Sequence, residues 1–265
     1  MEASINGIRM NYAVEGLETG IPVVLHHPLA TNMTIWDELT AALTPRYRVL
    51  RFDARGHGKT DAPVGPYVFE TLAADVVALM DHVKIERAHF LGLSMGGMAG
   101  QYLGLGHAKR FKSLQLVATS SRVPAEARHL WSDRVKVVRE KGMASQPPTS
   151  MQRWLTEANR QKPALVARLS QMIETTPAEG YIGWCQAIRE FNVTSRLAGI
   201  KLPVRIIAGG IDPATTPAMM QVIHREIPGS EYAEVPGTAH MLHVEEPAKF
   251  HAEVLPFMAK HGPKG

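Results

Sequence analysis

The sequence predicts an α/β fold in which a mostly parallel sheet is flanked by helices and carries one helical insertion. Strand-like runs alternate with segments of helical period over residues 1–121 and 199–265, as is typical of parallel sheets covered on both faces. Over residues 122–198 the strand signal disappears. The composition, 45% hydrophobic and 20% charged, is that of an ordinary globular protein.

The expected strands are short apolar runs bounded by turn residues. In chain order they fall at residues 22–26, 47–53, 88–93, 114–118, 204–208 and 231–235. Between them lie amphipathic stretches such as residues 70–83, where apolar side chains recur at helical spacing. Residues 8–14 follow an Asn6-Gly7 turn signal and are expected to form an antiparallel hairpin at the sheet edge.

The insertion is expected to be a helical cap on a single core. At a nominal ~150 residues per domain, the chain corresponds to roughly 1.8 domains. Residues 122–198 show helical patterns that are interrupted by prolines at positions 147, 148, 163 and 177. We therefore predict a core formed by residues 1–121 and 199–265, and a cap formed by residues 122–198, called the cap segment below.

Charge and cysteine content exclude several classes of protein. The formal charge of +4 is small and forms no long basic stripe, so nucleic-acid binding is not expected. The single cysteine, Cys185, excludes an intrachain disulfide and suits a reducing compartment. The first residues lack the pattern of a signal peptide, so we expect a cytoplasmic protein. Residues 88–108 are uncharged but hold six glycines, and we interpret them as a strand, a turn and a buried helix and not as a membrane span.

The strongest motif is a glycine-flanked serine between an expected strand and an expected helix, in Gly92-Leu93-Ser94-Met95-Gly96-Gly97. A nucleophile on such a turn needs small residues two positions to either side, because the turn is too sharp for side chains there. Gly92 and Gly96 meet this requirement. The motif therefore predicts Ser94 as a catalytic nucleophile, and the alternative is a structural serine in a Gly-rich turn.

A serine hydroxyl needs a base, and the base needs an orienting acid. When the nucleophile lies on such a turn, the acid and then the histidine follow it in the chain, each at the carboxyl end of a later strand. Asp212 and His240 occupy such positions, so we predict them as acid and base. The remaining candidates are weaker. His26, His27 and Asp53 lie near strand ends but precede Ser94, and His57 is expected to make a structural hydrogen bond in its loop. Asp37 and Glu245 are interpreted as ordinary helix-end charges.

Acyl transfer also needs donors for the developing oxyanion, usually two backbone N–H groups. One is expected from Met95, the residue after the nucleophile. The other is expected from the loop after the strand at residues 22–26, where Pro28 has no N–H and Leu29 is therefore the candidate. The sequence shows neither metal-ligand spacing nor a Gly-rich phosphate loop, so no metal and no cofactor are expected.

Several segments together resemble the α/β-hydrolases and, among them, the 3-oxoadipate enol-lactonases. These are Leu29-Ala30-Thr31-Asn32, Trp36-Asp37, Arg51 to Gly58, Asp61-Ala62-Pro63, Gly65-Pro66-Tyr67, Ile85 to Gly97, Thr176 to Tyr181 with Cys185, and Ala208 to Asp212 with Thr215-Thr216-Pro217. The resemblance implies an α/β-hydrolase fold and hydrolysis of a small carboxylate-bearing enol lactone in aromatic catabolism, the β-ketoadipate pathway. It assigns the triad to Ser94, Asp212 and His240, and the oxyanion hole to Leu29 and Met95.

In proteins of this fold the helical insertion covers the catalytic end of the sheet, so its aromatic residues are candidate pocket walls. The pocket candidates are His27, Trp131, Trp154, Trp184 and His243. A substrate carboxylate requires a cation nearby. The cap segment offers Arg128, Arg134, Arg153 and Arg189 for this purpose.

Other functions remain open at this point. The same triad serves general carboxylesterases, other lactonases and perhydrolases, which act on uncharged esters. A non-catalytic ligand receptor that keeps the hydrolase fold is a second class. A haloalkane dehalogenase is excluded, because its nucleophile position holds an aspartate and this chain has Ser94 there.

Overall fold

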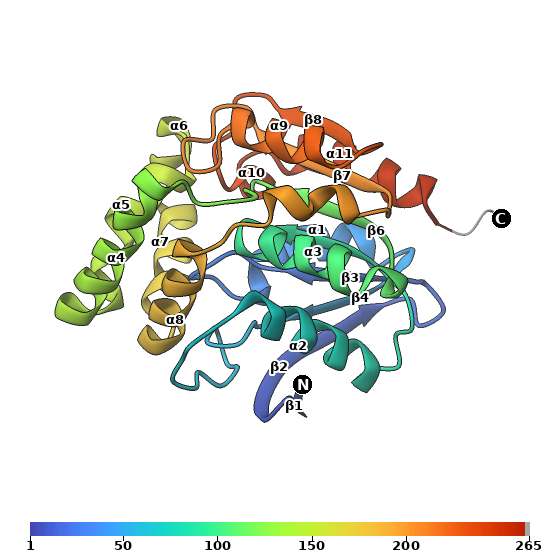
Figure 1. Cartoon of the computed structure of the whole chain (residues 1–265), viewed down its shortest axis with the longest axis horizontal. Coiled ribbons are helices and arrows are strands. Elements are labelled where there is room, and N and C mark those ends of the chain that lie inside the picture. Colours follow the sequence, from blue (N-terminus) through green and yellow to red (C-terminus); the bar gives the residue numbers. More distant parts are fainter. Residues whose placement is uncertain (263–265) are drawn as a thin grey trace.

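The computed structural model describes residues 1–262, which contain one eight-stranded sheet in the order β1-β2-β4-β3-β5-β6-β7-β8 (Figure 1). β1 is antiparallel to β2 and β2 to β4, and the other neighbouring pairs are parallel. The strands are β1 (Glu2–Ile5), β2 (Ile8–Gly16), β3 (Ile21–His26), β4 (Tyr47–Phe52), β5 (Ala88–Leu93), β6 (Phe111–Val117), β7 (Val204–Gly209) and β8 (Glu231–Val235). This confirms the predicted mostly parallel sheet and its edge hairpin. The last predicted core residues, 263–265, lie outside the described part of the chain.

Helices cover both faces of the sheet, so its central strands are buried on both sides. All six residues of β5, for example, are buried. α2 packs against α3, and α1 packs against α11 behind the sheet as viewed in Figure 1. The core α-helices are α1 (Asp37–Leu43), α2 (Phe69–His82), α3 (Met95–Gly106), α9 (Pro217–Glu226), α10 (Leu242–Glu245) and α11 (Pro247–Lys260). Short 3-10 helices are η1 (Met33–Trp36), η2 (Ala108–Arg110), η3 (Ala125–Ala127), η4 (Met143–Ser145) and η5 (Thr194–Gly199).

One strand begins earlier than its polar residues suggest. β6 starts at Phe111, three residues before the predicted start. Phe111 is fully buried, and the ladder to β5 has an irregularity between Ala88 and His89 that leaves Lys112 without a partner residue. Ser113 is also buried, and its hydroxyl lies 2.7 Å from Nδ1 of His89, which satisfies its hydrogen bonding. The polar residues Lys112 and Ser113 therefore made the strand look as if it began at Leu114.

The cap segment contains only helices, apart from an isolated bridge between Arg122 and Asn192 at its two ends. Its helices gather at one end of the sheet (Figure 1). They are α4 (Arg128–Lys141), α5 (Pro147–Trp154), α6 (Glu157–Arg160), α7 (Pro163–Glu174) and α8 (Ala178–Arg189). α8 lies directly on the loop after β4: a Cβ at Gly180 would lie 2.0 Å from the carbonyl oxygen of Gly56. Only glycine permits this approach of two backbones.

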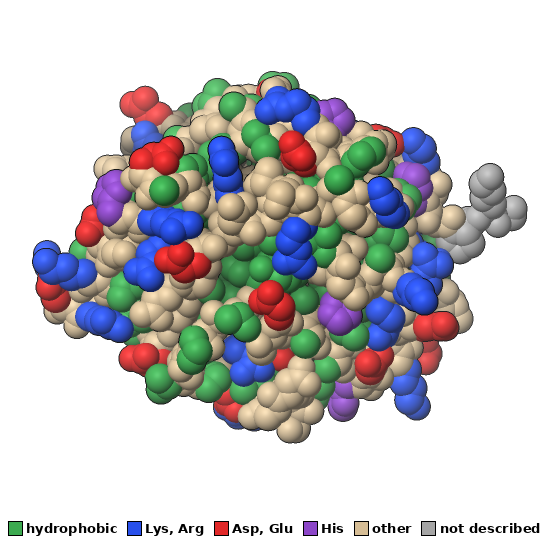
Figure 2. All heavy atoms as spheres, viewed as in Figure 1, with side chains coloured by type: hydrophobic (Ala, Val, Ile, Leu, Met, Phe, Trp, Pro, Cys, Tyr) green, Lys and Arg blue, Asp and Glu red, His purple; other side chains and the backbone are tan. Residues whose placement is uncertain are grey.

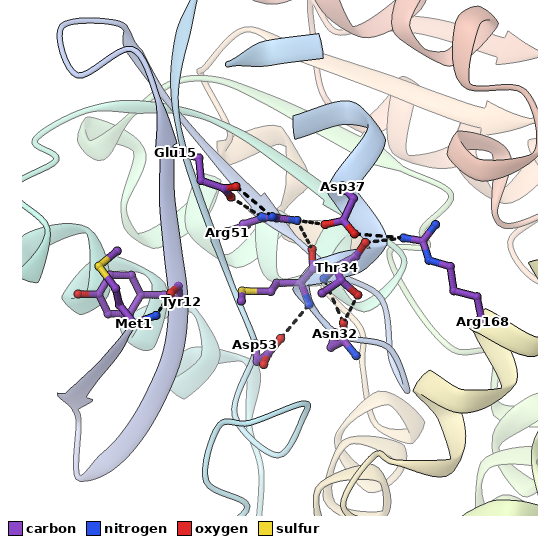
Figure 3. A network of polar contacts seen from close by, with 10 residues as sticks. Met1, Tyr12, Glu15, Asn32, Thr34, Asp37, Arg51, Asp53 and Arg168 are labelled. Carbon is purple, nitrogen blue, oxygen red and sulfur yellow. Dashed lines mark hydrogen bonds and ion pairs between the residues drawn. The ribbon is translucent and has the colours of Figure 1, made fainter. Parts of the chain in front are cut away.

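A polar network attaches the other side of the cap segment to the core (Figure 3). Arg168 on α7 donates to the carbonyl of Thr34 at 2.5 Å and lies 3.8 Å from Asp37. Asp37 in turn pairs with Arg51, which also contacts Glu15 at 2.6 Å. The Arg168 and Asp37 side chains are 40% and 55% exposed, so this attachment is screened by solvent and contributes little stability.

The surface shows no large patch of one charge on the face drawn in Figure 2. On the face drawn in Figure 2, charged side chains of both signs are interspersed. Among the described residues, no helix has the length and apolar character needed to span a membrane. The uncharged run at residues 88–108 forms β5, a turn and α3, as the glycines in it predict.

Candidate active site

Ser94 lies on a sharp turn between β5 and α3. Its backbone has φ 55° and ψ −111°, a region that non-glycine residues rarely adopt. A Cβ at Gly92 would lie 2.2 Å from the carbonyl oxygen of Gly96, and a Cβ at Gly96 would lie 2.4 Å from that of His26. The two glycines are therefore required by close backbone approach, and together they allow the chain to reverse and present Ser94 at the end of the strand.

Asp212 and His240 lie beyond the carboxyl ends of β7 and β8, on the same edge of the sheet as Ser94. Nδ1 of His240 is 2.8 Å from Oδ2 of Asp212. The carboxylate also accepts hydrogen bonds from the N–H of Ala214 at 2.7 Å and from the N–H and hydroxyl of Thr215 at 3.1 and 2.7 Å. Burial alone would raise the pKa of Asp212, but His240 and these donors outweigh burial and hold the pKa below its usual value. Asp212 is thus an ionised acceptor that orients the imidazole.

Ser94 and His240 both line a cavity of about 230 Å³ between the sheet edge and the cap segment. The loop after β3 and the cap segment supply most of its walls. They include Pro28, Leu29 and Ala30 from the loop after β3, and Leu130, Trp131, Arg134, Arg153, Trp154 and Tyr181 from the cap segment. The arrangement brings Ser94 and the Asp212-oriented His240 to the lining of one mostly apolar cavity.

The loop after β3 and the first residue of α3 each leave one backbone N–H group unpaired within residues 1–262. The N–H groups of Leu29 and Met95 donate to no protein atom within residues 1–262. Ala30, the next residue in the loop, has φ 60°. Its N–H donates to Nε2 of His57 at 3.0 Å, which supports this strained conformation.

His27 is a support of this loop and not a wall of the cavity, which corrects its assignment as a pocket candidate. Its Nε2 accepts a hydrogen bond from the N–H of Ala54 at 2.9 Å, and its Nδ1 lies 2.8 Å from the carbonyl oxygen of Pro28. An unprotonated Nε2 requires a neutral ring, and burial lowers the pKa of both His27 and His57 accordingly. Both histidines contact the backbone of the loop after β3, His27 at the carbonyl oxygen of Pro28 and His57 at the N–H of Ala30.

Two of the three cap tryptophans line the cavity and one does not. Trp131 and Trp154 are wall residues. Trp184 is fully buried elsewhere: its indole N–H donates to the carbonyl of Arg55 at 2.8 Å, and its ring packs 5.1 Å from that of Tyr67. The structure therefore corrects the prediction for Trp184, whose side chain attaches α8 to the core.

His243 is also outside the cavity. Its ring is buried against Trp36, with the ring centroids 4.7 Å apart, and lies 6.0 Å from that of Phe250. One helical turn separates it from His240, but α10 directs its side chain into the core. The prediction that it lines the pocket is corrected by this packing.

The structure selects two of the four cap arginines. Arg134 and Arg153 line the cavity, whereas Arg128 and Arg189 form exposed ion pairs with Glu190. On α4 the cavity residues are spaced by three or four, which places Arg134 one turn after Trp131; its guanidinium lies 4.1 Å from that ring. Arg128 is also three residues from Trp131, so helical spacing alone does not separate the two arginines; the ion pair of Arg128 with Glu190 does.

A third arginine, Arg122, was missed because it precedes the cap helices. It lies a few residues beyond the end of β6 and lines the cavity at an exposed rim. Among residues 1–262, Arg122, Arg134 and Arg153 have no carboxylate partner within 4.0 Å. Burial and the nearby Arg134 charge lower the pKa of Arg153 to about 10, so it stays charged at neutral pH. The cavity therefore has unpaired positive charge among the residues that line it together with Ser94 and His240.

The described residues contain no group of three or more His, Cys, Asp or Glu side chains arranged to hold a metal ion. The cavity lining instead brings together the Ser94 hydroxyl and the His240 imidazole, and the ring of His240 is hydrogen-bonded to Asp212.

Comparisons with known proteins agree with this geometry. A family model described as the alpha/beta hydrolase fold matches residues 21–247. The chain is 35% identical to 3-oxoadipate enol-lactonase 2 of Acinetobacter baylyi, over 96% of this chain and 94% of that protein, and 31% identical to enol-lactonase 1 of the same organism over 92% and 91%. The crystal structure of the enol-lactonase from Burkholderia xenovorans LB400 superposes with a TM-score of 0.94 at 34% identity, covering 98% and 100% of the two chains. The chain therefore belongs to the α/β-hydrolase family and is similar over nearly its whole length to 3-oxoadipate enol-lactonases.

Proposed function

We propose that this hydrolase cleaves a small carboxylate-bearing enol lactone of the 3-oxoadipate type through an acyl-enzyme on Ser94. One observation carries the proposal: a single cavity is lined by Ser94 and His240 and by unpaired arginines of the cap segment, of which Arg134 and Arg153 come from its helices and Arg122 lies at the exposed rim. A nucleophile and a cation in one small cavity suit a substrate that has a reactive carbonyl at one end and a carboxylate at the other.

The first half of the reaction acylates the serine. Oγ of Ser94 attacks the lactone carbonyl carbon while His240 accepts the hydroxyl proton, and Asp212 stabilises the imidazolium. The backbone N–H groups of Leu29 and Met95 receive the oxyanion. When the tetrahedral intermediate collapses, the ring C–O bond breaks. The leaving enolate takes the proton from His240 and rearranges to a ketone.

The second half releases the product. Water attacks the acyl carbon and transfers a proton to His240, which passes it to Oγ of Ser94 as the ester bond breaks. The acyl group leaves as a second carboxylate. Arg134 and Arg153 hold the first carboxylate during both halves, so the lactone carbonyl stays over the nucleophile.

A substrate panel tests the proposal. We expect kcat/KM for 3-oxoadipate enol-lactone to exceed that for neutral aryl esters of similar size. Replacing both arginines, in an Arg134→Met/Arg153→Met variant, is expected to lower kcat/KM for the lactone by about 10- to 100-fold, because a charge-assisted hydrogen bond contributes about 1.5–3 kcal/mol. Hydrolysis of the neutral ester is expected to change by less than about threefold.

Arg189→Met is the matched control, because Arg189 is a cap arginine that pairs with Glu190 at the surface. It is expected to leave both activities at the wild-type level. Equal losses on the lactone and on the neutral ester in the double variant would contradict the carboxylate-binding role. A preference of the wild-type enzyme for neutral esters would instead favour the general carboxylesterase, for which the apolar cavity walls Met98, Val123 and Ile188 provide a site.

A further inference from the structure

Glu245 is a buried carboxylate that the proposed reaction does not use. It ends α10 and is 6% exposed, so its interpretation as an ordinary helix-end charge is corrected. Its Oε1 accepts hydrogen bonds from the N–H of Thr156 at 2.6 Å and from Nδ2 of Asn159 at 2.9 Å, and its Oε2 accepts from the N–H of Ala239 at 2.5 Å. No Lys, Arg or His nitrogen within residues 1–262 forms an ion pair with it. A buried side chain that accepts hydrogen bonds from three N–H donors holds those donors in fixed positions relative to one another.

The donors come from two separate parts of the chain. Thr156 and Asn159 belong to the start of α6 in the cap segment, where the Thr156 hydroxyl also accepts from the N–H and Nδ2 of Asn159. Ala239 belongs to the loop that carries His240. One carboxylate therefore joins the cap segment to the residue directly before the proposed base.

A second contact joins the same two parts on the other side of the base. The N–H of Met241 donates to the carbonyl of Trp154, at the end of α5, at 3.0 Å. The backbone N–H groups of the two residues that flank His240 are thus both bound, that of Ala239 by Glu245 and that of Met241 by the cap segment. Trp154 also lines the cavity, so the cap wall and the base share one attachment.

The loop is fixed on its remaining side by the acid loop. The N–H of Ile211 donates to the carbonyl of Thr238 at 3.0 Å, and a Cβ at Gly209 would lie 2.1 Å from the carbonyl oxygen of Ala239. The backbone around His240 therefore has close contacts on the acid side and hydrogen bonds on the cap side. If the cap-side hydrogen bonds were lost, the contacts with the acid loop would be the ones left to hold this backbone.

We propose that Glu245 is a positioning residue that fixes the backbone of the catalytic histidine to the cap segment, so that a docked cap and a correctly placed base depend on one carboxylate. The inference rests on the proposed Ser94, Asp212 and His240 triad. It differs from a purely structural role in one respect: displacement of the loop moves the base relative to Ser94 and slows proton transfer in a protein that is still folded.

Glu245→Gln tests this role with almost no change in shape. An amide has one acceptor oxygen, so its NH₂ group must face either Ala239 or the cap donors. We expect the rate constant for phosphonylation of Ser94 by a small neutral fluorophosphonate to fall by about tenfold or more, because small displacements of a catalytic group cost up to about 100-fold. This probe needs the triad and the oxyanion hole but no cap contact.

Glu246→Gln is the matched control, because Glu246 is the adjacent residue and its side chain is 44% exposed in a surface pair with Lys249. It is expected to react at the wild-type rate. A Glu245→Gln protein that is folded by near-UV circular dichroism and reacts at the wild-type rate would overturn the positioning role. If the probe failed to label Ser94 in the wild-type protein, the proposed function itself would fail, and the two failures are therefore distinguishable.

Rescue by a second substitution separates positioning from a general loss of stability. In Glu245→Gln/Asn159→Asp, the new carboxylate at position 159 can accept from the amide NH₂, while the amide oxygen accepts from Ala239. The hydroxyl of Thr156 can then donate to the new carboxylate. We expect this double variant to react faster than Glu245→Gln alone. A double variant that is no faster would contradict a bridge between the cap segment and the histidine loop.

Discussion

Ser94→Ala is expected to lower kcat/KM for lactone and ester substrates alike by at least about a thousandfold. Its hydroxyl is the nucleophile in the proposed reaction, and removing a nucleophile leaves only the contribution of binding and of the oxyanion donors. A similar loss is expected for both substrates because the same hydroxyl attacks the carbonyl carbon of each. Steady-state kinetics on both substrates, with labelling by a fluorophosphonate, measures it.

Ser120→Ala is the control for this experiment, because Ser120 is a second serine that lines the same cavity. It is expected to retain activity within a few-fold of wild type and to label normally. If Ser94→Ala kept more than about a thousandth of the wild-type activity, the triad assignment would be wrong. Absence of labelling in a catalytically inactive wild-type protein would favour the ligand-receptor alternative.

Acidification from pH 7 to pH 5 is expected to reduce the free energy of unfolding steeply. Burial lowers the pKa of His26 to about 3, of His89 to about 4 and of His243 to about 3. In the unfolded chain these groups have pKa values near 6.5, so below that pH the unfolded chain binds protons that the folded chain does not. The stability they contribute is present above about pH 6.5 and is lost as the pH falls toward 4.

The size of the effect follows from the number of rings. Each neutral buried histidine contributes a slope of up to about 1.4 kcal/mol per pH unit, so three of them give about 4 kcal/mol per unit below pH 6. Typical domains have a total stability of about 5–15 kcal/mol. Urea unfolding at pH 8, 7, 6 and 5 is therefore expected to show a strong loss of stability before the carboxylates begin to protonate.

His243→Phe isolates one ring from the others. Neither ring nitrogen of His243 has a hydrogen-bond partner within the described residues, and its neighbours Trp36 and Phe250 are aromatic. The substitution is expected to flatten the pH dependence by about 1.4 kcal/mol per unit, while any change in packing shifts the free energy of unfolding equally at all pH values. The exposed His129, replaced in the same way, is expected to leave the slope unchanged. An unaltered slope in His243→Phe would contradict the linkage.

The candidate triad could be predicted because chain order and strand ends determine it. Parallel strands place their carboxyl ends on one edge of a sheet, so residues that follow β5, β7 and β8 must lie close together. Glycines two positions to either side of Ser94 indicate the turn from sequence alone. The prediction depended on where the strands end and on their being parallel. Short apolar runs mark strands well.

The cavity walls could be predicted only in part, because they depend on how the cap helices pack. Trp131 and Arg134 share a helical stripe, which the sequence contains, but the side of the stripe that faces the core is decided by docking. Trp184 has the same residue type and lies in the same segment as Trp131, yet it donates to the carbonyl of Arg55 in the core. Residue type and segment therefore did not distinguish a pocket wall from a packing contact.

The amino-acid sequence was sufficient to predict the α/β class, the helical character of the cap segment and the identity of the residues proposed as nucleophile, acid and base. These features follow from local periodicity, turn chemistry and chain order, which act over short distances. The tertiary structure alone decided which arginines face the cavity, why His27 supports a loop and why Glu245 is buried while Glu246 is exposed. These properties arise from contacts between distant segments, 27 residues apart for His27 with Ala54 and 89 residues apart for Glu245 with Thr156. Adjacent glutamates look alike until such segments meet.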